Sequence, residues 1–394
     1  QRNMQTILSL ISQKKITPEK LVTHTFQFSD VLQAYELLTG KKDEPYLGIV
    51  LEYPDSEKQQ SSIELKKIQK ENKIELALIG AGNFSQSVAL PALSKQDVGF
   101  NTIVDYDTSI GNHIGKKFGF SKVSSSLQDV LNNKDINTVM ITTPHNTHAK
   151  LVTECLKAKK NVFVEKPLAM NEQELEDIKK EYENSNKLIL VGFNRRFSTH
   201  AKKIREFMKE AGTPMVMNYI INAGAIPPEH WTQNLEVGGG RIIGEVCHFV
   251  DFMQYISGSN PTHVYAVSID TDNILYKNDD SVQFTLKFKD GSVGCITYHA
   301  VGDRSLPKEY FEVSAGTKTA KMYNFYRTEL YHDGKKSKFA SKGQDKGFIK
   351  EYTQFFDAIK KGKESPVSFS EIYASTLATI RAVESIKTGL ALGI

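Results

Sequence analysis

The chain has 394 residues, of which 40% are apolar and 24% are charged, a composition typical of a folded globular protein with more than one domain. Its formal net charge is +4 and its basic residues form no concentrated stripe, which argues against a nucleic-acid-binding protein. No apolar run is long enough to span a bilayer, so we expect no membrane partner.

The three cysteines, Cys155, Cys247 and Cys295, are far apart in the sequence. They fit no metal-ligand spacing and leave an odd number for any disulfide scheme, so we expect no metal site and a reducing compartment. The N-terminus lacks the features of a signal peptide, which predicts a cytoplasmic location. Because the chain begins at Gln1 rather than Met, we expect it to be a fragment of a longer protein.

The sequence predicts that residues 1–55 form a small unit of their own and that residues 56–72 form a linker. Periodicity predicts two helices, Met4–Ser12 and Ser29–Leu38, and two strands, Leu21–Phe26 and Leu47–Tyr53. The next stretch, Pro54–Asn72, is rich in Ser, Gln, Lys and Glu, which is typical of a solvated, partly helical connector.

Residues 73–193 alternate between short apolar strands and polar-faced helices. The expected strands are Ile74–Ile79, Thr102–Val104, Thr138–Thr142, Asn161–Val164 and Leu188–Gly192. Because these strands are apolar on both sides, they favour a parallel sheet with helices on both faces. We therefore predict an α/β fold that begins with a doubly wound Rossmann domain.

For residues 194–394 the sequence predicts an α+β domain with a large, mostly antiparallel open sheet. The expected strands are Met215–Ile221, Thr262–Ile269, Val282–Phe288, Val293–His299 and Phe311–Ala315, with helices at Gly347–Ile359 and Phe369–Thr388. An open sheet face with apolar side chains would favour aggregation unless a subunit covers it, so we expect a homodimer or homotetramer.

A glycine turn lies between the first strand and first helix of the Rossmann region, at Gly80-Ala81-Gly82-Asn83-Phe84-Ser85. Glycines there let backbone N–H groups approach a pyrophosphate at the helix N-terminus, and Ser85 is small enough for close packing at the third position. Asp105 follows the next strand, where a carboxylate binds a ribose 2′-hydroxyl and repels a 2′-phosphate. The motif predicts a dinucleotide site, built from Gly80, Gly82, Asn83, Phe84, Ser85 and Asp105, that prefers NAD to NADP.

Two further polar segments follow the fourth and fifth strands of this region. They contribute Thr143, Pro144, His145 and His148, and then Glu165, Lys166 and Pro167. Ligands of open parallel sheets lie at the carboxyl ends of the strands, so we expect these residues to face the nicotinamide. Taken alone, Lys166 could equally be a surface lysine before a proline.

These motifs occur in an order that resembles the Gfo/Idh/MocA family of oxidoreductases. The resemblance covers residues 73–394 and includes Gly192-Phe193-Asn194-Arg195-Arg196-Phe197 and Gly238-Gly239-Gly240 leading to His248. It implies hydride exchange between a nicotinamide and a sugar, cyclitol or nucleotide-linked sugar. It also implies that Lys166 and His248 are the catalytic pair and that Asn194 lies beside the cofactor.

The chemistry of a dehydrogenase fits these residues, because a hydroxyl that is oxidised loses a proton as hydride leaves. His248 would be the base, and Lys166 would stabilise the alkoxide. Without the resemblance, His248 reads as a histidine on a buried helix. Family members commonly carry an Asp four residues before this histidine, whereas this chain has Gly244 followed by Glu245. Residues that could line a sugar pocket are Arg196, Asn222, Trp231, Arg241 and Glu245.

Residues 11–51 resemble the closing segment of a zinc-type, medium-chain alcohol dehydrogenase, which suggests a bi-domain oxidoreductase. Such a fusion would suit a pathway that modifies a polysaccharide sugar. Two alternatives to a dehydrogenase stay open. One is an NAD-binding sensor or scaffold without turnover, and the other is an enzyme whose tightly held NAD is recycled during epimerisation or glycoside cleavage.

Overall fold

The computed structural model describes residues 2–53, 62–66, 73–212, 214–270 and 280–394, and it divides into two compact units, residues 1–61 and 62–394. Within the described residues, no helix is both long and apolar enough to cross a membrane. The linker predicted at residues 56–72 lies largely outside the described ranges, but Ser62–Glu64 within it forms strand β3 of the second unit.

The first unit contains a β-α-β arrangement after an N-terminal helix. Its elements are α1 (Arg2–Ser12), η1 (Pro18–Leu21), β1 (Val22–Gln27), η2 (Phe28–Asp30), α2 (Val31–Leu38) and β2 (Gly48–Glu52). Strands β1 and β2 pair in parallel, and Ala34 and Leu37 bury the inner face of α2. The two predicted helices and two predicted strands are thus confirmed, with α2 beginning two residues later than expected.

The second unit begins with a seven-stranded sheet of order β3-β6-β5-β4-β7-β8-β9. Only the edge strand β3 is antiparallel. Its elements are β4 (Glu75–Ile79), η3 (Ser85–Ala89), α3 (Leu90–Leu93), β5 (Gly99–Val104), α4 (Thr108–Phe118), β6 (Lys122–Ser124), α5 (Gln128–Leu131), β7 (Thr138–Ile141), η4 (His145–Thr147), α6 (His148–Lys157), β8 (Asn161–Val164), α7 (Glu172–Ser185) and β9 (Ile189–Val191). The chain order reverses beside β4, so the crevice of this doubly wound sheet opens at the carboxyl ends of β4 and β7.

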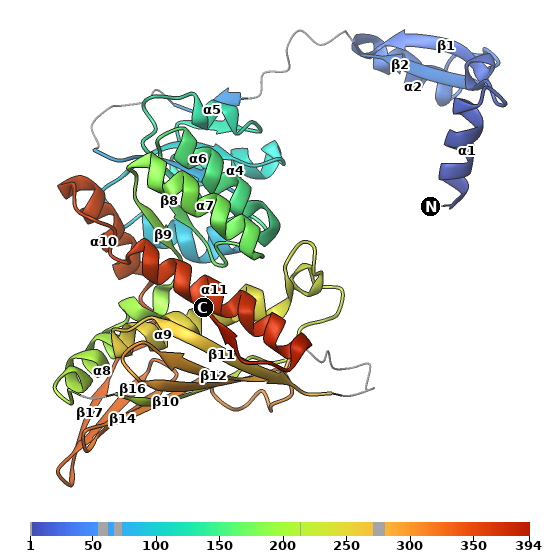
Figure 1. Ribbon diagram of the computed structural model, residues 1–394. Coiled ribbons are helices and arrows are strands. Elements are labelled where there is room, and N and C mark those ends of the chain that lie inside the picture. Colours follow the sequence, from blue (N-terminus) through green and yellow to red (C-terminus); the bar gives the residue numbers. More distant parts are fainter. Residues whose placement is uncertain (1, 54–61, 67–72, 213, 271–279) are drawn as a thin grey trace. The chain divides into compact units, whose positions relative to one another are not determined.

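The remainder forms a nine-stranded sheet of order β17-β16-β15-β14-β10-β13-β12-β11-β18, in which only β10 and β13 pair in parallel. Its elements are η5 (Asn194–Phe197), α8 (Thr199–Lys209), β10 (Val216–Asn222), η6 (Trp231–Gln233), η7 (Ile242–Val246), α9 (Cys247–Ser257), β11 (Pro261–Ser268), β12 (Val282–Phe288), β13 (Val293–His299), β14 (Glu309–Ala315), β15 (Lys318–Tyr323), β16 (Arg327–His332), β17 (Lys335–Ala340), α10 (Phe348–Lys361), α11 (Phe369–Thr388) and β18 (Leu392–Gly393). Figure 1 shows α8, α9 and α11 beside this sheet. The side chains of β10, β11 and β12 alternate between buried and exposed, as the sequence predicted for a sheet covered on one face.

The C-terminal helices join the two sheets into one body. The rings of Tyr352 and Phe355 on α10 lie 5.1 Å and 6.0 Å from the ring of Phe163 on β8, inside the Rossmann core. On α11, Ile372 belongs to that core and Ala382 to the core under the second sheet. Residues that are distant in sequence therefore tie the two sheets together.

Candidate functional site

In the glycine turn after β4, the backbone lies close to the neighbouring loop on one side and is open on the other. Gly80 has a φ of +95°, and a Cβ there would lie 3.0 Å from the carbonyl oxygen of Thr142. Around Gly82 a Cβ would meet nothing within 4 Å, so the turn is open on that side. Ser85 is buried and its hydroxyl donates to the carbonyl of Gly80 at 2.8 Å, which fixes the start of the helix against the strand. These features fit a bound dinucleotide phosphate.

Asp105 follows β5 and lies beside this turn. Its carboxylate accepts hydrogen bonds from the backbone N–H of Ala81 at 2.7 Å and of Asp107 at 2.9 Å. Both bonds hold the carboxylate at the end of the strand, and a carboxylate has further lone pairs for ribose hydroxyls. This position fits the role that the sequence predicted for Asp105.

His148 ties the two polar loops together. Its ring is fully buried, with Nδ1 2.7 Å from the carbonyl oxygen of Pro167 and Nε2 2.9 Å from that of Thr143. Burial lowers the pKa of His148. The histidine therefore acts as a brace between the loop after β7 and the loop after β8, rather than as a group that faces the crevice freely.

Lys166 leaves the end of β8 and reaches the helix that carries His248. Its ammonium donates to the carbonyl oxygen of Gly244 at 2.7 Å. The carboxyl group of the neighbouring Glu165 lies against Gly192, where a Cβ would come within 2.8 Å of a carboxyl oxygen. Burial raises the pKa of Glu165 to about 7, in spite of the opposing charge of Lys166.

His248 lies in the first turn of α9 and is buried. Burial, with the charges of Arg195 and Lys166 next, lowers the pKa of His248 well below its ordinary value, so the ring is neutral. Its Nδ1 atom is buried and has no hydrogen-bond partner among the described residues. A buried nitrogen without a hydrogen-bond partner is costly, and this atom is too well covered to contact a ligand directly.

One cavity of about 500 Å³ gathers these groups. It is lined by Phe84, Thr142, Thr143, His145, His148, Glu165, Lys166, Asn194, Arg195, Trp231, His248, Gln344, Lys346 and Phe348. The cavity therefore lies between the carboxyl ends of the parallel strands and the first turn of α9, as the topology of a doubly wound sheet predicts.

His145 is the residue that seals one wall of this cavity. Its Nδ1 is 2.8 Å from the carbonyl oxygen of Gly238, and its ring meets that of Trp231 edge-on at 4.7 Å. Burial, assisted by the charge of Lys166, lowers the pKa of His145 to about 3. The ring is thus neutral and held from two sides.

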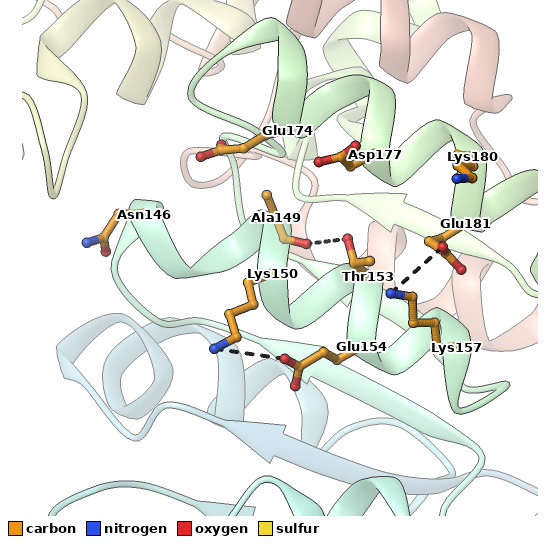
Figure 2. A pocket seen from close by; sticks show the side chains of 10 residues that line it. All are labelled: Asn146, Ala149, Lys150, Thr153, Glu154, Lys157, Glu174, Asp177, Lys180 and Glu181. Atoms are coloured by element: carbon orange, nitrogen blue, oxygen red, sulfur yellow. Dashed lines mark hydrogen bonds and ion pairs between the residues drawn. The ribbon is translucent and has the colours of Figure 1, made fainter.

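A separate hollow lies between α6 and α7 (Figure 2). Its lysines and acids are paired with one another, as in Lys150–Glu154 at 3.9 Å and Lys157–Glu181 at 3.8 Å. It contains none of the residues that the motifs identify. It is a charged, solvated groove on the Rossmann domain and not the candidate site.

Two family models match the chain on either side of the cavity. The model of the oxidoreductase family with an NAD-binding Rossmann fold matches residues 74–193, and the Gfo/Idh/MocA C-terminal domain matches residues 203–315. The chain belongs to the Gfo/Idh/MocA oxidoreductase family. Both matches lie within residues 74–315, so they lend no support to the resemblance of residues 11–51 to an alcohol dehydrogenase.

Curated members of the family match in part. The myo-inositol 2-dehydrogenase of Thermotoga maritima is 30% identical over 186 residues, which is 46% of this chain and 55% of the relative. An uncharacterised oxidoreductase of Bacillus subtilis is 31% identical over 179 residues, 44% of this chain and 52% of the relative. The match thus spans about half the length of these two relatives.

Solved structures share the fold over a longer part of the chain. An oxidoreductase domain protein from Kribbella flavida has a TM-score of 0.74 at 18% identity, and covers 82% of this chain and 99% of its own. A levoglucosan dehydrogenase in complex with NADH and levoglucosan has a TM-score of 0.72 at 19% identity, with the same coverage. These similarities show that both sheets have the arrangement found in Gfo/Idh/MocA proteins.

Several residues predicted to contact a sugar lie outside the cavity lining. Arg196 is buried in ion pairs with Asp251 at 2.7 Å and Glu371 at 3.0 Å. Arg241 donates to the hydroxyl of Tyr298 at 2.7 Å and to the carbonyl of Gly224 at 3.1 Å. Because these guanidinium groups are already bound by protein acceptors, they hold the fold together instead of facing a ligand.

Two of the other three predicted sugar contacts, Asn222 and Glu245, are also bound by protein groups. The Asn222 amide donates to the carbonyl oxygen of Asp303 at 2.7 Å, while its buried Oδ1 has no partner among the described residues. Glu245 accepts from Tyr298 at 2.7 Å and from Lys308, and lies 3.5 Å from Arg241. Of the five predicted sugar contacts, Trp231 is the one that lines the cavity.

Sequence reasoning missed the cavity residues contributed by the segment that leads into α10 and by the first residue of that helix. Gln344, Lys346 and Phe348 lie about 150 residues after Asn194, yet the Asn194 amide donates to the carbonyl oxygen of Lys346 at 2.8 Å. At Gly347, with φ of +88°, a Cβ would lie 2.3 Å from the carbonyl oxygen of Asn194. That glycine was the available signal, since it permits the close approach.

Proposed function

We propose that this chain is a nicotinamide-dependent dehydrogenase that oxidises a hydroxyl of a sugar or cyclitol, or reduces the corresponding ketone. The observation that carries the proposal is that Lys166, in the loop after β8, and His248, on helix α9, line one cavity beside the glycine turn. In support, curated relatives are named for myo-inositol 2-dehydrogenase and levoglucosan dehydrogenase activities.

In this proposal, the chain's own residues manage the proton. His248 is neutral and lines the cavity, so its ring can accept the proton of a substrate hydroxyl. Lys166, fixed through Gly244, stabilises the negative oxygen that forms at the same time. A bound nicotinamide supplies the hydride acceptor.

The cofactor is proposed to be NAD rather than NADP. Asp105 is held at the end of β5 by two backbone N–H groups, where its charge repels a 2′-phosphate. Gly80, Gly82, Asn83, Phe84 and Ser85 would hold the pyrophosphate, while Thr143, His145, Glu165, Lys166 and Asn194 would surround the nicotinamide. Pro144, His148 and Pro167 would fix the loops that carry these contacts.

The assembly is proposed to be a homodimer or homotetramer that buries the open face of the nine-stranded sheet. Val216 and Ile220 on β10 and Val293 on β13 expose their apolar side chains on this face. Exposed apolar side chains on neighbouring strands favour a covering subunit. Light scattering that gives a monomer would contradict this assignment.

Turnover of a panel of cyclitols, anhydro-sugars, free sugars and nucleotide-sugars with NAD, followed by NADH formation, tests the proposed reaction. Lys166→Ala should lower kcat by roughly 100-fold or more, because one preorganised group that stabilises charge contributes this much. Lys150→Ala, which removes an exposed lysine of the outer groove, is the matched control. A wild-type chain that binds NAD but turns over no substrate would favour a sensor or scaffold.

A further inference from the structure

The charged side chains that line the cavity are unbalanced. Lys166, Arg195 and Lys346 are cationic, and Glu165 is the single acid among the described lining residues. The acids just behind the lining must therefore be considered before the cavity is called positive.

Glu309 neutralises one of these cations but not two. Arg195 donates to both of its oxygens, from Nε at 2.8 Å and from Nη2 at 2.9 Å, so the pair is bidentate. Lys346 lies 3.2 Å from the same carboxylate. Two cations share one negative charge, and the ammonium of Lys346 is partly exposed in the cavity.

Lys166 forms no ion pair among the described residues, although its charge opposes the protonation of Glu165 and Glu245. Its ammonium donates to the carbonyl oxygen of Gly244. Position 244 carries no carboxylate, and the space beside it is taken by the neutral ring of His145. The adjacent Glu245 is occupied by Lys308, Arg241 and Tyr298, again with two cations on one carboxylate.

Two further observations agree with a positive cavity. Burial lowers the pKa of His248 most, and the charges of Arg195, Lys166, Lys308 and Lys346 lower it further. Glu165, the one lining acid, has its pKa raised to about 7 by burial, so a large part of it is uncharged at neutral pH. Substrate binding that left this excess charge uncompensated in a partly buried site would be unfavourable.

We propose that the substrate of this cavity is an anionic sugar, one that bears a carboxylate or a phosphate group, and that Lys346 determines this specificity together with Lys166. The inference rests on the proposed function. It narrows the substrate from sugars and cyclitols in general to those with a negative charge.

Binding to the chain saturated with NADH tests the inference without requiring turnover. The probes are matched pairs: glucuronate and galacturonate against glucose and galactose, gluconate against sorbitol, and glucose 6-phosphate against glucose. Hydrogen bonds to charged groups are worth more than those between neutral groups, so the anionic member should bind about tenfold tighter in at least one pair. Acids and phosphates in separate arms tell which anion is recognised.

Variants of Lys346 separate a charge effect from a structural one. We compare the Kd of the neutral sugar with the Kd of the anionic sugar in each pair. Lys346→Gln should lower this ratio severalfold, whereas Lys346→Arg should retain it, because the positive charge is kept. Lys361→Gln removes an exposed lysine of α10 and should leave the ratio unchanged. Arg195 and Tyr219 still bind Glu309 in both Lys346 variants, so the fold is expected to persist.

Equal or tighter binding of the neutral sugars, or no binding in either class, would overturn the inference. Turnover of a neutral cyclitol without any preference for charge would overturn it while leaving the proposed dehydrogenase standing. Selective binding of an anionic sugar with no NADH formation would support the inference and count against the proposed reaction.

Discussion

The ring of His145 occupies the space that a side chain at position 244 would need. A Cβ built on Gly244 would lie 2.9 Å from His145 Cε1, and the ring cannot retreat easily because its Nδ1 is 2.8 Å from the carbonyl oxygen of Gly238. The carboxylate that resembling proteins commonly carry at position 244 is therefore excluded by a histidine about 100 residues earlier. The two positions form one structural unit.

Gly244→Ala should destabilise the chain. Alanine normally stabilises a helical position relative to glycine by about 0.5–1 kcal/mol, but here overpacking against His145 should cost about 1–3 kcal/mol. Thermal unfolding should show a lower midpoint for Gly244→Ala, whereas Gly343→Ala, whose Cβ meets nothing within 4 Å, should show little change. In a His145→Ala background the same substitution should become neutral or stabilising; a raised midpoint in the wild-type background would refute the clash.

Asp105→Asn should weaken the preference for NAD. The substitution removes the charge that repels a 2′-phosphate and keeps an acceptor for the backbone N–H of Ala81. We expect the ratio of NADP to NAD dissociation constants to fall about tenfold, equivalent to about 1.4 kcal/mol. Asp177→Asn, in the outer groove, is the control, and an unchanged ratio in Asp105→Asn would show that Asp105 does not read the ribose.

Glu165 should make NAD binding depend on pH near neutrality. Burial raises its pKa to about 7, so its carboxylate ionises as the pH rises through that value. The new negative charge favours the cationic nicotinamide of NAD over neutral NADH, so NAD affinity should rise relative to NADH between about pH 6 and pH 8. Calorimetry should show this trend in the wild type and in Glu174→Gln. In Glu165→Gln the ratio of NAD affinity to NADH affinity should not change with pH. The same slope in Glu165→Gln would assign the titration elsewhere.

Glu309 should contribute to acid sensitivity. Burial alone would raise its pKa, but Arg195 and Lys346, with the hydroxyl of Tyr219, lower it to about 2. A carboxyl with a depressed pKa stabilises the fold above its unfolded pKa of about 4.3, and this contribution, about 3 kcal/mol, is lost as the pH falls toward 2. The free energy of unfolding of the wild type, measured in urea, should therefore fall steeply as the pH drops from about 4.3 to 2. Glu309→Gln should be less stable at neutral pH and show a shallower acid slope; an identical slope would exclude Glu309 as its source.

Hydrophobic patterning predicted the interior of the fold well. Asn161–Val164, Val282–Phe288, Val293–His299 and Phe369–Thr388 have the observed bounds, because their apolar side chains follow the period of a buried strand or a core-facing helix. The strands β15, β16 and β17, which end at one edge of the second sheet, were missed. Their sequences are rich in Lys, Arg and Glu, and they pair partly through ion pairs such as Lys321–Glu312 and Lys336–Glu329.

The site was predictable where it depends on a local motif. The glycine turn, the loop after β7 and Glu165-Lys166 each follow a strand, and strand ends meet at one edge of a parallel sheet. Arg196 and Arg241 could not be placed, since their partners lie on other elements and an arginine in a buried ion pair resembles one in a binding site. The cavity residues at the start of α10 depend on a return of the chain across the sheet, for which Gly347 is the one local signal among the described residues.

Thermal unfolding of the chain titrated with NAD, NADH, NADP and NADPH tests the central claim most directly, because a ligand that binds the folded state raises its apparent stability. If the glycine turn, Asp105 and the cavity form a dinucleotide site, NAD or NADH should raise the unfolding midpoint more than the phosphorylated forms do. Lys166→Ala should retain that rise. If none of the four nicotinamides moves the midpoint, the chain is not a nicotinamide-dependent dehydrogenase.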